Sequence, residues 1–257
     1  MQKVKPKKHL GQHFLTDINI ASKIVDALDT SNKGTILEIG PGTGVLTNSF
    51  ADNPIFYAIE VDKESIEFLK STYTERDFVL ENDVLKLNFN QFEAPIGIIG
   101  NLPYNISSQI FFKVLDNIDN ITEVVCMIQK EVAERLAAPP GSKTYGILSV
   151  LLQTWFDIEY LFTVHENCFN PPPKVKSAVI RLTRNERSTL PCSPSLFKSV
   201  VKQSFNQRRK TLRNSLKNIC LNLEEISNQS GNRPEQLSVE EFIKLTIQIE
   251  KSSAKPE

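Results

Sequence analysis

Apolar, β-branched runs alternate with helical patterns along the first half of this chain, and that alternation limits its possible folds more than any other feature. Alternating strands and helices build parallel sheets that carry helices on their faces. Five runs are predicted to be buried strands: Thr35–Gly40, Ile55–Glu60, Asp77–Glu81, Ile96–Gly100 and Glu123–Ile128. Helices are predicted before and between them over Asp17–Leu28, Val45–Ala51, Lys63–Tyr73 and Ser107–Leu115. The sequence therefore predicts an α/β fold with a doubly wound, mostly parallel sheet.

The pattern changes after residue 135. A helix is predicted over Gly146–Trp155, and the strands Asp157–Val164 and Ala178–Thr183 follow with no helix between them, so we expect these strands to be antiparallel at the sheet edge. Beyond Arg184 only helices are predicted, over Pro194–Phe205, Arg208–Cys220 and Val239–Glu250. We expect a sheet domain over residues 1–186, an all-α domain over residues 187–257 and a disordered tail from Lys251.

Positive charge is concentrated in two places, although the 30 Lys and Arg residues balance 30 Asp and Glu residues overall. Residues 194–223 contain seven Lys and Arg residues and no Asp or Glu, and the amino terminus adds Lys3, Lys5, Lys7 and Lys8.

The four cysteines are far apart and form no Cys-x-x-Cys pair, which favours reduced thiols over a disulfide framework or a zinc site. No apolar run is long enough to span a bilayer, and we predict a cytoplasmic protein.

A glycine loop follows the first predicted strand, in Leu37-Glu38-Ile39-Gly40-Pro41-Gly42-Thr43-Gly44. The spacing lacks the final glycine of a dinucleotide fingerprint, and no Gly-Lys-Ser/Thr follows as in a phosphate-binding P-loop. Glu60, at the end of the next strand, is placed to accept hydrogen bonds from ribose hydroxyls, and Asp83 can accept one from an adenine amine. We assign Gly40, Gly42, Glu60 and Asp83 to a nucleoside-bearing cofactor; a glycine loop that only makes a tight turn is the alternative.

The segment Asn101-Leu102-Pro103-Tyr104 ends the fourth predicted strand. The Asn101 side-chain oxygen and the Leu102 carbonyl can each accept a hydrogen bond from an adenine N6 amine. They would also stabilise the positive charge that develops during methyl transfer. Pro103 fixes the turn, and Tyr104 can stack on a purine. With the glycine loop, these groups predict methyl transfer from S-adenosylmethionine to a base amine, with no metal and no general base. An Asx turn that caps the next helix is the structural alternative.

Phe169, in Cys168-Phe169-Asn170-Pro171-Pro172-Pro173, is a candidate for the other face of the base. A core aromatic before a rigid proline loop is the alternative interpretation. The sequence alone does not choose between them.

Six segments resemble the ribosomal RNA adenine N6,N6-dimethyltransferases, and most resemble the bacterial small-subunit members of that family. The similar segments are Gly11–Leu15, Glu38–Gly44, Asn101–Ser107, Pro140–Gly146, Phe169–Ser177 and Phe205–Asn214. The resemblance implies a Rossmann-like class I methyltransferase fold, with a mostly parallel seven-stranded sheet that has an antiparallel edge strand, and a small all-α C-terminal domain. It also implies contacts to S-adenosylmethionine at His13, Leu15, Gly40, Glu60, Asp83 and Asn101. Relatives often have Asn at position 13, which puts a side-chain role for His13 in question.

The resemblance further implies a substrate: two adjacent adenosines in the loop of the 3′-terminal hairpin of small-subunit rRNA, each methylated twice within an assembling 30S particle. The expected protein is a monomer that contacts neither a membrane nor a metal. The absence of acidic residues over positions 194–223 favours phosphate contacts over a merely solvated helix face. The predicted RNA-binding residues are Lys198, Lys202, Arg208, Arg209, Lys210, Arg213 and Lys217.

Three other functions stay open at this point. The chain can be a ribosome-assembly factor in which methylation is a checkpoint, or a large-subunit rRNA adenine methyltransferase that confers antibiotic resistance. A DNA amino-methyltransferase would need the same site chemistry. The sequence does not fix the modified adenosines or the order in which they are methylated.

Overall fold

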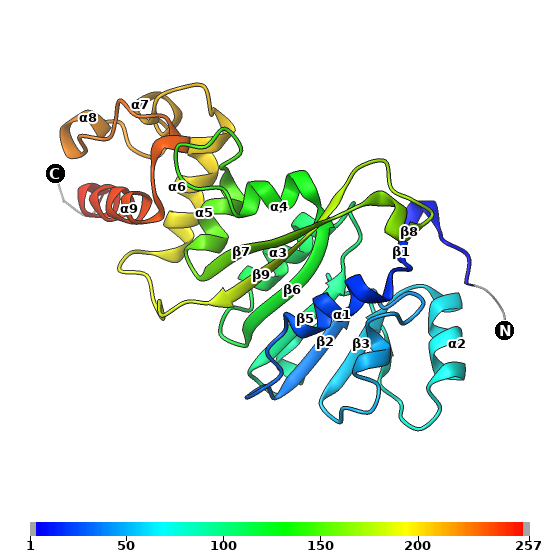
Figure 1. The fold of residues 1–257 in the computed structure, drawn as a ribbon. Helices are drawn as coiled ribbons and strands as arrows, with labels where there is room; N and C mark the ends of the chain where they lie inside the picture. Colours follow the sequence, from blue (N-terminus) through cyan, green and yellow to red (C-terminus); the bar gives the residue numbers. More distant parts are fainter. Residues whose placement is uncertain (1–3, 254–257) are drawn as a thin grey trace. The chain divides into compact units, whose positions relative to one another are not determined.

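The computed structural model describes residues 4–253, and a seven-stranded sheet forms its centre (Figure 1). The strand order is β4-β3-β2-β5-β6-β9-β7. The bounds are β2 Thr35–Ile39, β3 Phe56–Glu60, β4 Val79–Glu81, β5 Ile96–Asn101, β6 Ile121–Gln129, β7 Phe156–Val164 and β9 Ser177–Arg184. Strands β2 to β6 are parallel to their neighbours, and β9 is antiparallel to β6. The predicted α/β sheet is therefore confirmed, with β7 outside β9 at the edge.

The central strands are buried along their length because helices and loops cover both faces of a parallel sheet. All five residues of β2 are buried, and five of the six residues of β5 are. Gly100 in β5 allows the neighbouring strand to come close, since a Cβ at that position would lie 2.5 Å from the Ile39 carbonyl oxygen. The end of β5 is thereby held against the end of β2, where the predicted site residues begin.

A side-chain cap marks the start of the first helix of the sheet region. Asp17 accepts hydrogen bonds from the backbone N–H groups of Asn19 and Ile20, at 2.9 and 3.1 Å, and begins the first helix. The helices of this region are α1 Ile18–Asp26, α2 Lys63–Thr72 and α3 Ser107–Leu115, with short 3₁₀ turns at Lys8–Leu10, Phe89–Gln91 and Glu166–Cys168. A small antiparallel pair, β1 Phe14–Leu15 and β8 Phe169–Asn170, joins the amino-terminal segment to the proline loop.

The helix predicted over residues 45–51 is wrong. Only a 3₁₀ turn forms there, at Thr47–Ser49, with hydrogen bonds from Ser49 N–H to the Leu46 oxygen and from Phe50 N–H to the Thr47 oxygen. Thr, Asn and Ser are weak helix formers, and the Thr47 hydroxyl is bonded to Glu38 instead of to its own turn.

The helix predicted over residues 208–220 is also wrong, since only α7, Leu212–Ser215, is helical within it. Lys210 N–H closes a turn on the Gln207 oxygen, and the N–H groups of Leu212 and Arg213 donate to Asn232 and Ser230. Tertiary hydrogen bonds therefore replace the helical ladder. At the end of the chain, the last helix continues to Ser253, so residues 251–253 are helical; residues 254–257 lie outside the described part.

Two compact units divide the chain. One contains the chain up to Ala133 together with Asp157–Arg184, and the other contains Glu134–Phe156 and the chain from Asn185 onward. Sequence periodicity predicted one continuous first domain to residue 186, whereas residues 134–156 belong with the C-terminal helices. The pattern missed this because that segment resembles one more helix of the strand–helix series.

The second unit is helical. Its helices are α5 Ile147–Gln153, α6 Pro194–Asn206, α7, α8 Leu223–Ile226 and α9 Val239–Ser253, with a 3₁₀ turn at Pro234–Gln236; α4, Lys130–Leu136, runs into it. Phe197 and Val200 of α6 are buried, as are Phe242 and Leu245 of α9, and α6 packs against both α5 and α9. A capping box precedes α9: Ser238 N–H donates to the Glu241 carboxylate at 2.7 Å, and Glu241 N–H donates to the Ser238 hydroxyl at 3.3 Å. Within residues 4–253, no helix combines the length and the apolar character needed to cross a bilayer.

A buried ion pair ties the chain before β2 to β6. Lys33 Nζ lies 3.1 Å from the Glu123 carboxylate, and the two side chains are only 9% and 5% exposed. Asp29 N–H donates to the same carboxylate at 3.3 Å.

Lys33→Met is expected to lower the free energy of unfolding by about 3 kcal/mol, because Glu123 would stay buried without its counter-ion. Urea unfolding measures the loss. Glu159→Ala is the matched control: it breaks the more exposed pair with Arg181, so it should cost less than about 1 kcal/mol. An equal cost for the two variants would contradict the assignment of the buried pair.

Candidate active site

One cavity of about 370 Å³ lies at the carboxyl ends of β2, β3, β4 and β5, where α/β sheets bind ligands. It is large enough for a nucleoside. The lining contains nine of the predicted residues: His13, Gly40, Gly42, Glu60, Asp83, Asn101, Leu102, Pro103 and Tyr104. Segments that are far apart in the sequence are thus brought together around one space.

The glycine loop forms the floor at the end of β2. Gly40, Gly42 and Gly44 have φ values of +69°, +55° and +80°, which side chains with a Cβ rarely adopt. At Gly42 a Cβ would also lie 2.8 Å from the Phe14 ring, so the amino-terminal segment can approach the loop only because that position is glycine. This supports a ligand-binding loop held close to a second chain segment over a simple tight turn.

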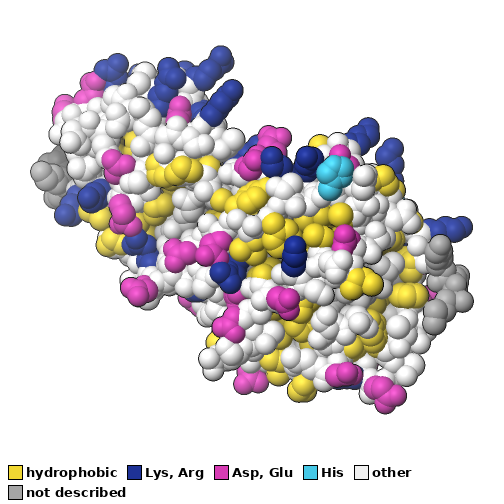
Figure 2. Space-filling model, in the orientation of Figure 1, with side chains coloured by type: hydrophobic (Ala, Val, Ile, Leu, Met, Phe, Trp, Pro, Cys, Tyr) yellow, Lys and Arg dark blue, Asp and Glu magenta, His cyan; other side chains and the backbone are white. Residues whose placement is uncertain are grey.

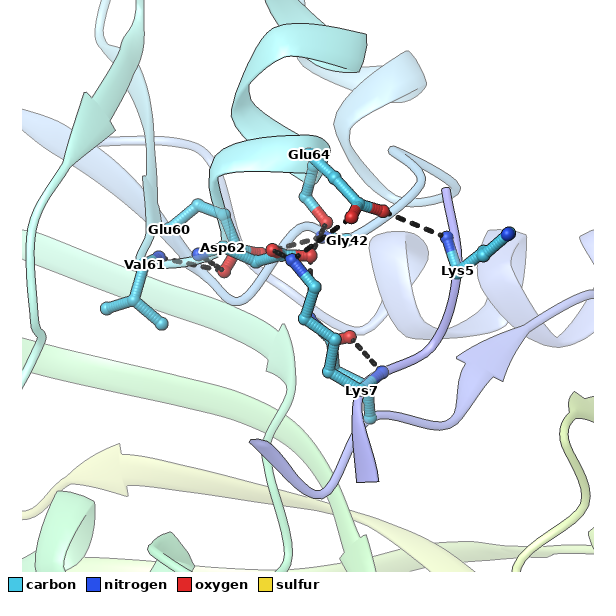
Figure 3. A network of polar contacts seen from close by, with 9 residues as sticks. Lys5, Lys7, Gly42, Glu60, Val61, Asp62 and Glu64 are labelled. Carbon is cyan, nitrogen blue, oxygen red and sulfur yellow. Dashed lines mark hydrogen bonds and ion pairs between the residues drawn. The ribbon is translucent and has the colours of Figure 1, made fainter. Parts of the chain in front are cut away.

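Glu60 is held by backbone donors at the end of β3 (Figure 3). Its Oε1 accepts from the N–H groups of Val61 and Asp62 at 2.8 and 2.9 Å, and its Oε2 accepts from Gly42 N–H at 3.2 Å. Burial raises the pKa of Glu60, although these three hydrogen bonds oppose the shift. One acceptor position remains on Oε2, because a carboxylate oxygen can accept two hydrogen bonds.

The segment that precedes the cavity lining is bound to the turn between β3 and α2. Lys7 forms an ion pair with the buried carboxylate of Asp62, and Gln12 Nε2 donates to the same carboxylate at 3.3 Å (Figure 3). Lys5 N–H donates to Glu64 at 3.4 Å. Burial alone would raise the pKa of Asp62, but the hydrogen bonds from Lys7, Ser65 and Gln12 lower it below its usual value.

Sequence reasoning missed this pairing, since it noted the amino-terminal lysines only as a concentration of positive charge. Lys7 is instead bound to Asp62, and Lys3 lies outside the described residues. The only sequence signal was an Asp two residues after the predicted ribose acceptor Glu60.

The amide of Asn101 has a fixed orientation at the end of β5. Its Nδ2 donates to the His13 carbonyl oxygen at 2.8 Å, which leaves the Oδ1 side of the amide for a donor inside the cavity. Leu102 N–H donates to the Met127 oxygen at 3.0 Å, and the Pro103 carbonyl accepts from Ile106 N–H at 3.2 Å, so the turn after the strand is held at both ends. The predicted acceptor group of Asn101 is therefore directed before any ligand binds.

His13 contacts three parts of the site. Its carbonyl accepts from Asn101, its Nδ1 lies 2.8 Å from the Pro171 oxygen, and its ring stacks on Tyr104 with centroids 5.6 Å apart. The backbone and the side chain of His13 both have partners within the protein, and a contact of His13 with the cofactor stays a prediction.

Asp83 lines the cavity beyond β4 and accepts from Leu85 N–H at 3.0 Å.

Leu15 and Phe169 do not line the cavity. They are only 3% and 4% exposed, face each other across the β1–β8 pair and belong to the hydrophobic core. Neither side chain is presented to a ligand in this arrangement. For Phe169, this is what the alternative interpretation, a core aromatic before the proline loop, predicted. Cofactor contact at Leu15 and base stacking at Phe169 stay predictions.

The predicted RNA-binding residues lie in the second unit, around the turn that follows α6. Figure 2 shows Lys and Arg side chains gathered over the chain around α7. Arg209, Lys210 and Lys217 are exposed, and Arg208, Arg209 and Lys210 line a shallow cavity. Arg208 lies 3.7 Å from the Glu235 carboxylate, and Arg213 pairs with Glu224, so part of this charge is compensated within the protein. Lys198 and Lys202 lie on α6.

No group of three or more His, Cys, Asp or Glu side chains in residues 4–253 is arranged to hold a metal ion. The residues that gather at the cavity are hydrogen-bond acceptors, glycines and aromatic rings. Groups of these kinds can hold a nucleoside and orient an amine.

Comparison with known proteins agrees with this chemistry. A sequence model of the family described as "Ribosomal RNA adenine dimethylase" matches residues 3–251. A Bacteroides fragilis protein named "Ribosomal RNA small subunit methyltransferase A" is 56% identical over 265 residues, covering 100% of this chain and 96% of that protein. The protein of the same name from Flavobacterium johnsoniae is 55% identical over 257 residues, covering 97% of this chain and 98% of the relative.

Two solved structures share the fold. The crystal structure of a dimethyladenosine transferase from Plasmodium falciparum superposes with a TM-score of 0.81 at 27% identity, covering 94% of this chain and 98% of that one. The crystal structure of the 23S rRNA methyltransferase ErmE has a TM-score of 0.67 at 23% identity, covering 92% and 99%, and shows the fold alone.

Glu38, beneath the glycine loop, is a second buried carboxyl that sequence reasoning did not single out. It is 1% exposed and accepts from the Thr47 hydroxyl at 2.6 Å. Burial raises the pKa of Glu38 from 4.5 to about 8, the Thr47 hydrogen bond lowers it, and the nearby Glu60 raises it further. The folded protein therefore holds a proton on Glu38 between about pH 4.5 and 8 that the unfolded chain releases.

Because the folded-state pKa of Glu38 is the higher one, the stability it contributes is lost as pH rises through that window. Glu38→Gln removes the titration, so its free energy of unfolding relative to wild type should rise by up to roughly 1.4 kcal/mol per pH unit between pH 5 and 8. Urea unfolding at four pH values measures the slope of the free energy of unfolding against pH, for wild type and for Glu38→Gln. Glu159→Gln, at an exposed position, should leave the wild-type slope unchanged. Parallel slopes for wild type and Glu38→Gln would show that Glu38 is ionised in the fold.

Proposed function

The chain belongs to the ribosomal RNA adenine dimethylase family, and from this membership we propose that it methylates N6 of two adjacent adenosines in the 3′-terminal hairpin loop of small-subunit rRNA. It is an S-adenosylmethionine-dependent rRNA adenine N6,N6-dimethyltransferase. Each adenosine receives two methyl groups, within a 30S particle that is still assembling. The observation that carries the proposal is the Asn101 amide, whose Nδ2 is bound to the His13 carbonyl while its Oδ1 is left for an amine.

The cavity fits the methyl donor. Its volume of about 370 Å³ holds a nucleoside, the Glu60 Oε2 keeps one acceptor position for a ribose hydroxyl, and the glycine loop admits close approach of a ligand to the backbone. Asp83 would hold the adenine amine, and His13, Leu15, Gly40, Gly42 and Asn101 would contact the rest. When bound, S-adenosylmethionine supplies an electrophilic methyl group on a sulfonium.

The protein's own contribution is to orient the acceptor amine. The lone pair of an adenine N6 is delocalised into the ring, so the amine must be turned until that lone pair faces the methyl group. Asn101 Oδ1 and the Leu102 carbonyl accept hydrogen bonds from its N–H groups, and both oxygens stabilise the positive charge on nitrogen until an N–H proton leaves to solvent. Pro103 holds the turn. Most of the acceleration then comes from positioning two already reactive groups.

The target base must leave its stack to reach this site, so a loop or a distorted helix is the expected substrate. Tyr104 gives the flipped base a face to stack on, worth about 1–3 kcal/mol for a typical aromatic–base pair. Phe169 would cover the opposite face only after a rearrangement, because its ring is buried in the core.

Contacts to the RNA backbone are assigned to the basic segment of the second unit. Arg209, Lys210 and Lys217 are exposed there, and no acidic residue occurs over positions 194–223. Arg208 and Arg213 are partly compensated by Glu235 and Glu224, so we expect smaller contributions from them.

Asn101→Ala is expected to lower the rate of methylation of unmethylated small subunits by about 100-fold, because one of the two amine acceptors is lost. Mass spectrometry of the rRNA measures dimethyladenosine, and calorimetry measures donor binding separately. Asn90→Ala, in the turn before β5, is the control and should keep full activity.

The same assay separates the competing functions. Wild-type activity on duplex DNA but not on small subunits would overturn the proposal in favour of a DNA enzyme. Full methylation by Asn101→Ala would overturn the catalytic assignment. If Asn101→Ala loses methylation yet still supports subunit maturation in cells, the assembly role is favoured.

The double variant Arg209→Ala/Lys210→Ala should weaken subunit binding and flatten its salt dependence. If each side chain neutralises one phosphate, the log–log slope falls by roughly 1.4 to 1.8. Binding is measured from 50 to 200 mM salt. Lys244→Ala/Lys251→Ala removes the same charge from exposed positions of α9 and should leave the slope unchanged. Equal effects of the two double variants would mean that net charge alone, and not this segment, governs binding.

A further inference from the structure

Tyr104 is held by two contacts that the function described so far does not use. Its hydroxyl is hydrogen-bonded to the Ser177 hydroxyl, and its ring stacks on the His13 imidazole with an interplanar angle of 27°. Burial raises the pKa of the Tyr104 phenol, with the Ser177 bond opposing the shift, so the phenol is protonated at neutral pH and able to donate. A residue on a turn between a strand and a helix thus has its side chain fixed at the tip and along one side.

Both supports are themselves rigid. Ser177 is fully buried, is the first residue of β9, and is paired in register with Gln129 of β6, so its hydroxyl is part of the sheet framework. His13 is fixed through Nδ1, 2.8 Å from the Pro171 oxygen, and through its carbonyl, which accepts from Asn101. The Tyr104 ring and the Asn101 amide therefore both contact His13, and the Tyr104 hydroxyl contacts the first residue of β9.

We propose that Ser177 is a positioning residue for methyl transfer, which holds the tip of the Tyr104 ring while the His13 imidazole sets the plane of that ring, so that a flipped adenine stacks on a ring of fixed position. The inference rests on the function proposed above and deepens it, because it assigns the orientation of the base to a hydroxyl outside the cavity lining. Ser177 contacts neither donor nor acceptor and acts only through Tyr104.

The need for such a support follows from the geometry of the reaction. A purine that stacks on a ring free to swing about its Cα–Cβ bond would shift and tilt with that ring, which moves N6 away from the Asn101 oxygen. Misplacement of a reacting atom by about 1 Å can cost up to 100-fold in rate. A ring fixed before the base arrives also lowers the ordering cost of binding. The effect of losing the support should therefore fall on kcat more than on donor affinity.

A double-mutant cycle tests the inference, with wild type, Ser177→Ala, Tyr104→Phe and the double variant assayed on unmethylated small subunits. Each single variant should lower kcat by roughly tenfold, with KM for the subunit and Kd for S-adenosylmethionine within about twofold of wild type. The double variant should be no slower than either single variant, because both remove the same hydrogen bond.

Ser204→Ala is the matched control. Ser204 is as fully buried as Ser177, but its hydroxyl bonds only the Val200 oxygen of its own helix, at 2.7 Å. It should lower the melting temperature by a similar amount and leave kcat unchanged. If Ser177 has a purely structural role, Ser177→Ala should therefore lower the melting temperature and leave kcat unchanged, as Ser204→Ala does. The non-additive loss of kcat in the Ser177 and Tyr104 variants would then not be seen.

Two results would overturn the inference: wild-type kcat for Ser177→Ala, or effects of the two single variants that multiply in the double variant. If Ser177→Ala does not fold, Tyr104→Phe leaves the serine in place and decides alone, because unchanged kcat would rule out a role for the bond. Failure of the proposed function is distinguishable, since wild-type protein would then leave the small subunits unmethylated.

Discussion

The hydrogen bond from Asn101 Nδ2 to the His13 carbonyl is the contact on which the arrangement of the site depends. An amide has a donor end and an acceptor end, so fixing the donor end also fixes where the acceptor oxygen lies. The bond joins residues 88 positions apart in the chain, at the end of β5 and in the amino-terminal segment. The acceptor site for an amine is therefore complete only when that segment lies over the sheet.

Two separate sets of contacts keep the amino-terminal segment in place. Near the cavity, β1 pairs with β8, and Gly42 leaves the room that the Phe14 ring occupies. Further out, Lys7 and Gln12 are bound to Asp62, which is buried at the start of α2 and shares its turn with Glu60, the proposed ribose acceptor. The same turn would thus serve both the proposed cofactor site and the segment that orients the Asn101 amide, and the backbone of residues 60–62 would couple the two halves of the proposed site.

The sequence predicted those parts of the site that follow from strand ends. Glu60 and Asn101 are the last residues of apolar strands, and Asp83 lies two residues beyond the end of another strand. The carboxyl ends of parallel strands meet at one edge, so the convergence of these residues needed no tertiary information. Pairs such as Lys7 with Asp62 or Tyr104 with Ser177 were not predictable, since they join positions 55 and 73 apart and leave no periodic signal. For the same reason the helix expected over residues 208–220 failed: its N–H groups bond to residues 230 and 232 instead.

The cavity therefore combines two kinds of rigidity. Glu60 is fixed by backbone N–H groups, which are part of the strand and loop and are present whichever side chains surround them. Tyr104 is fixed by the side chains of His13 and Ser177, which a single substitution can remove. Cofactor binding should then tolerate sequence change around the site better than base orientation does. Selection for the orientation of the base would accordingly act also on Ser177, which lies behind the Tyr104 ring and outside the cavity lining.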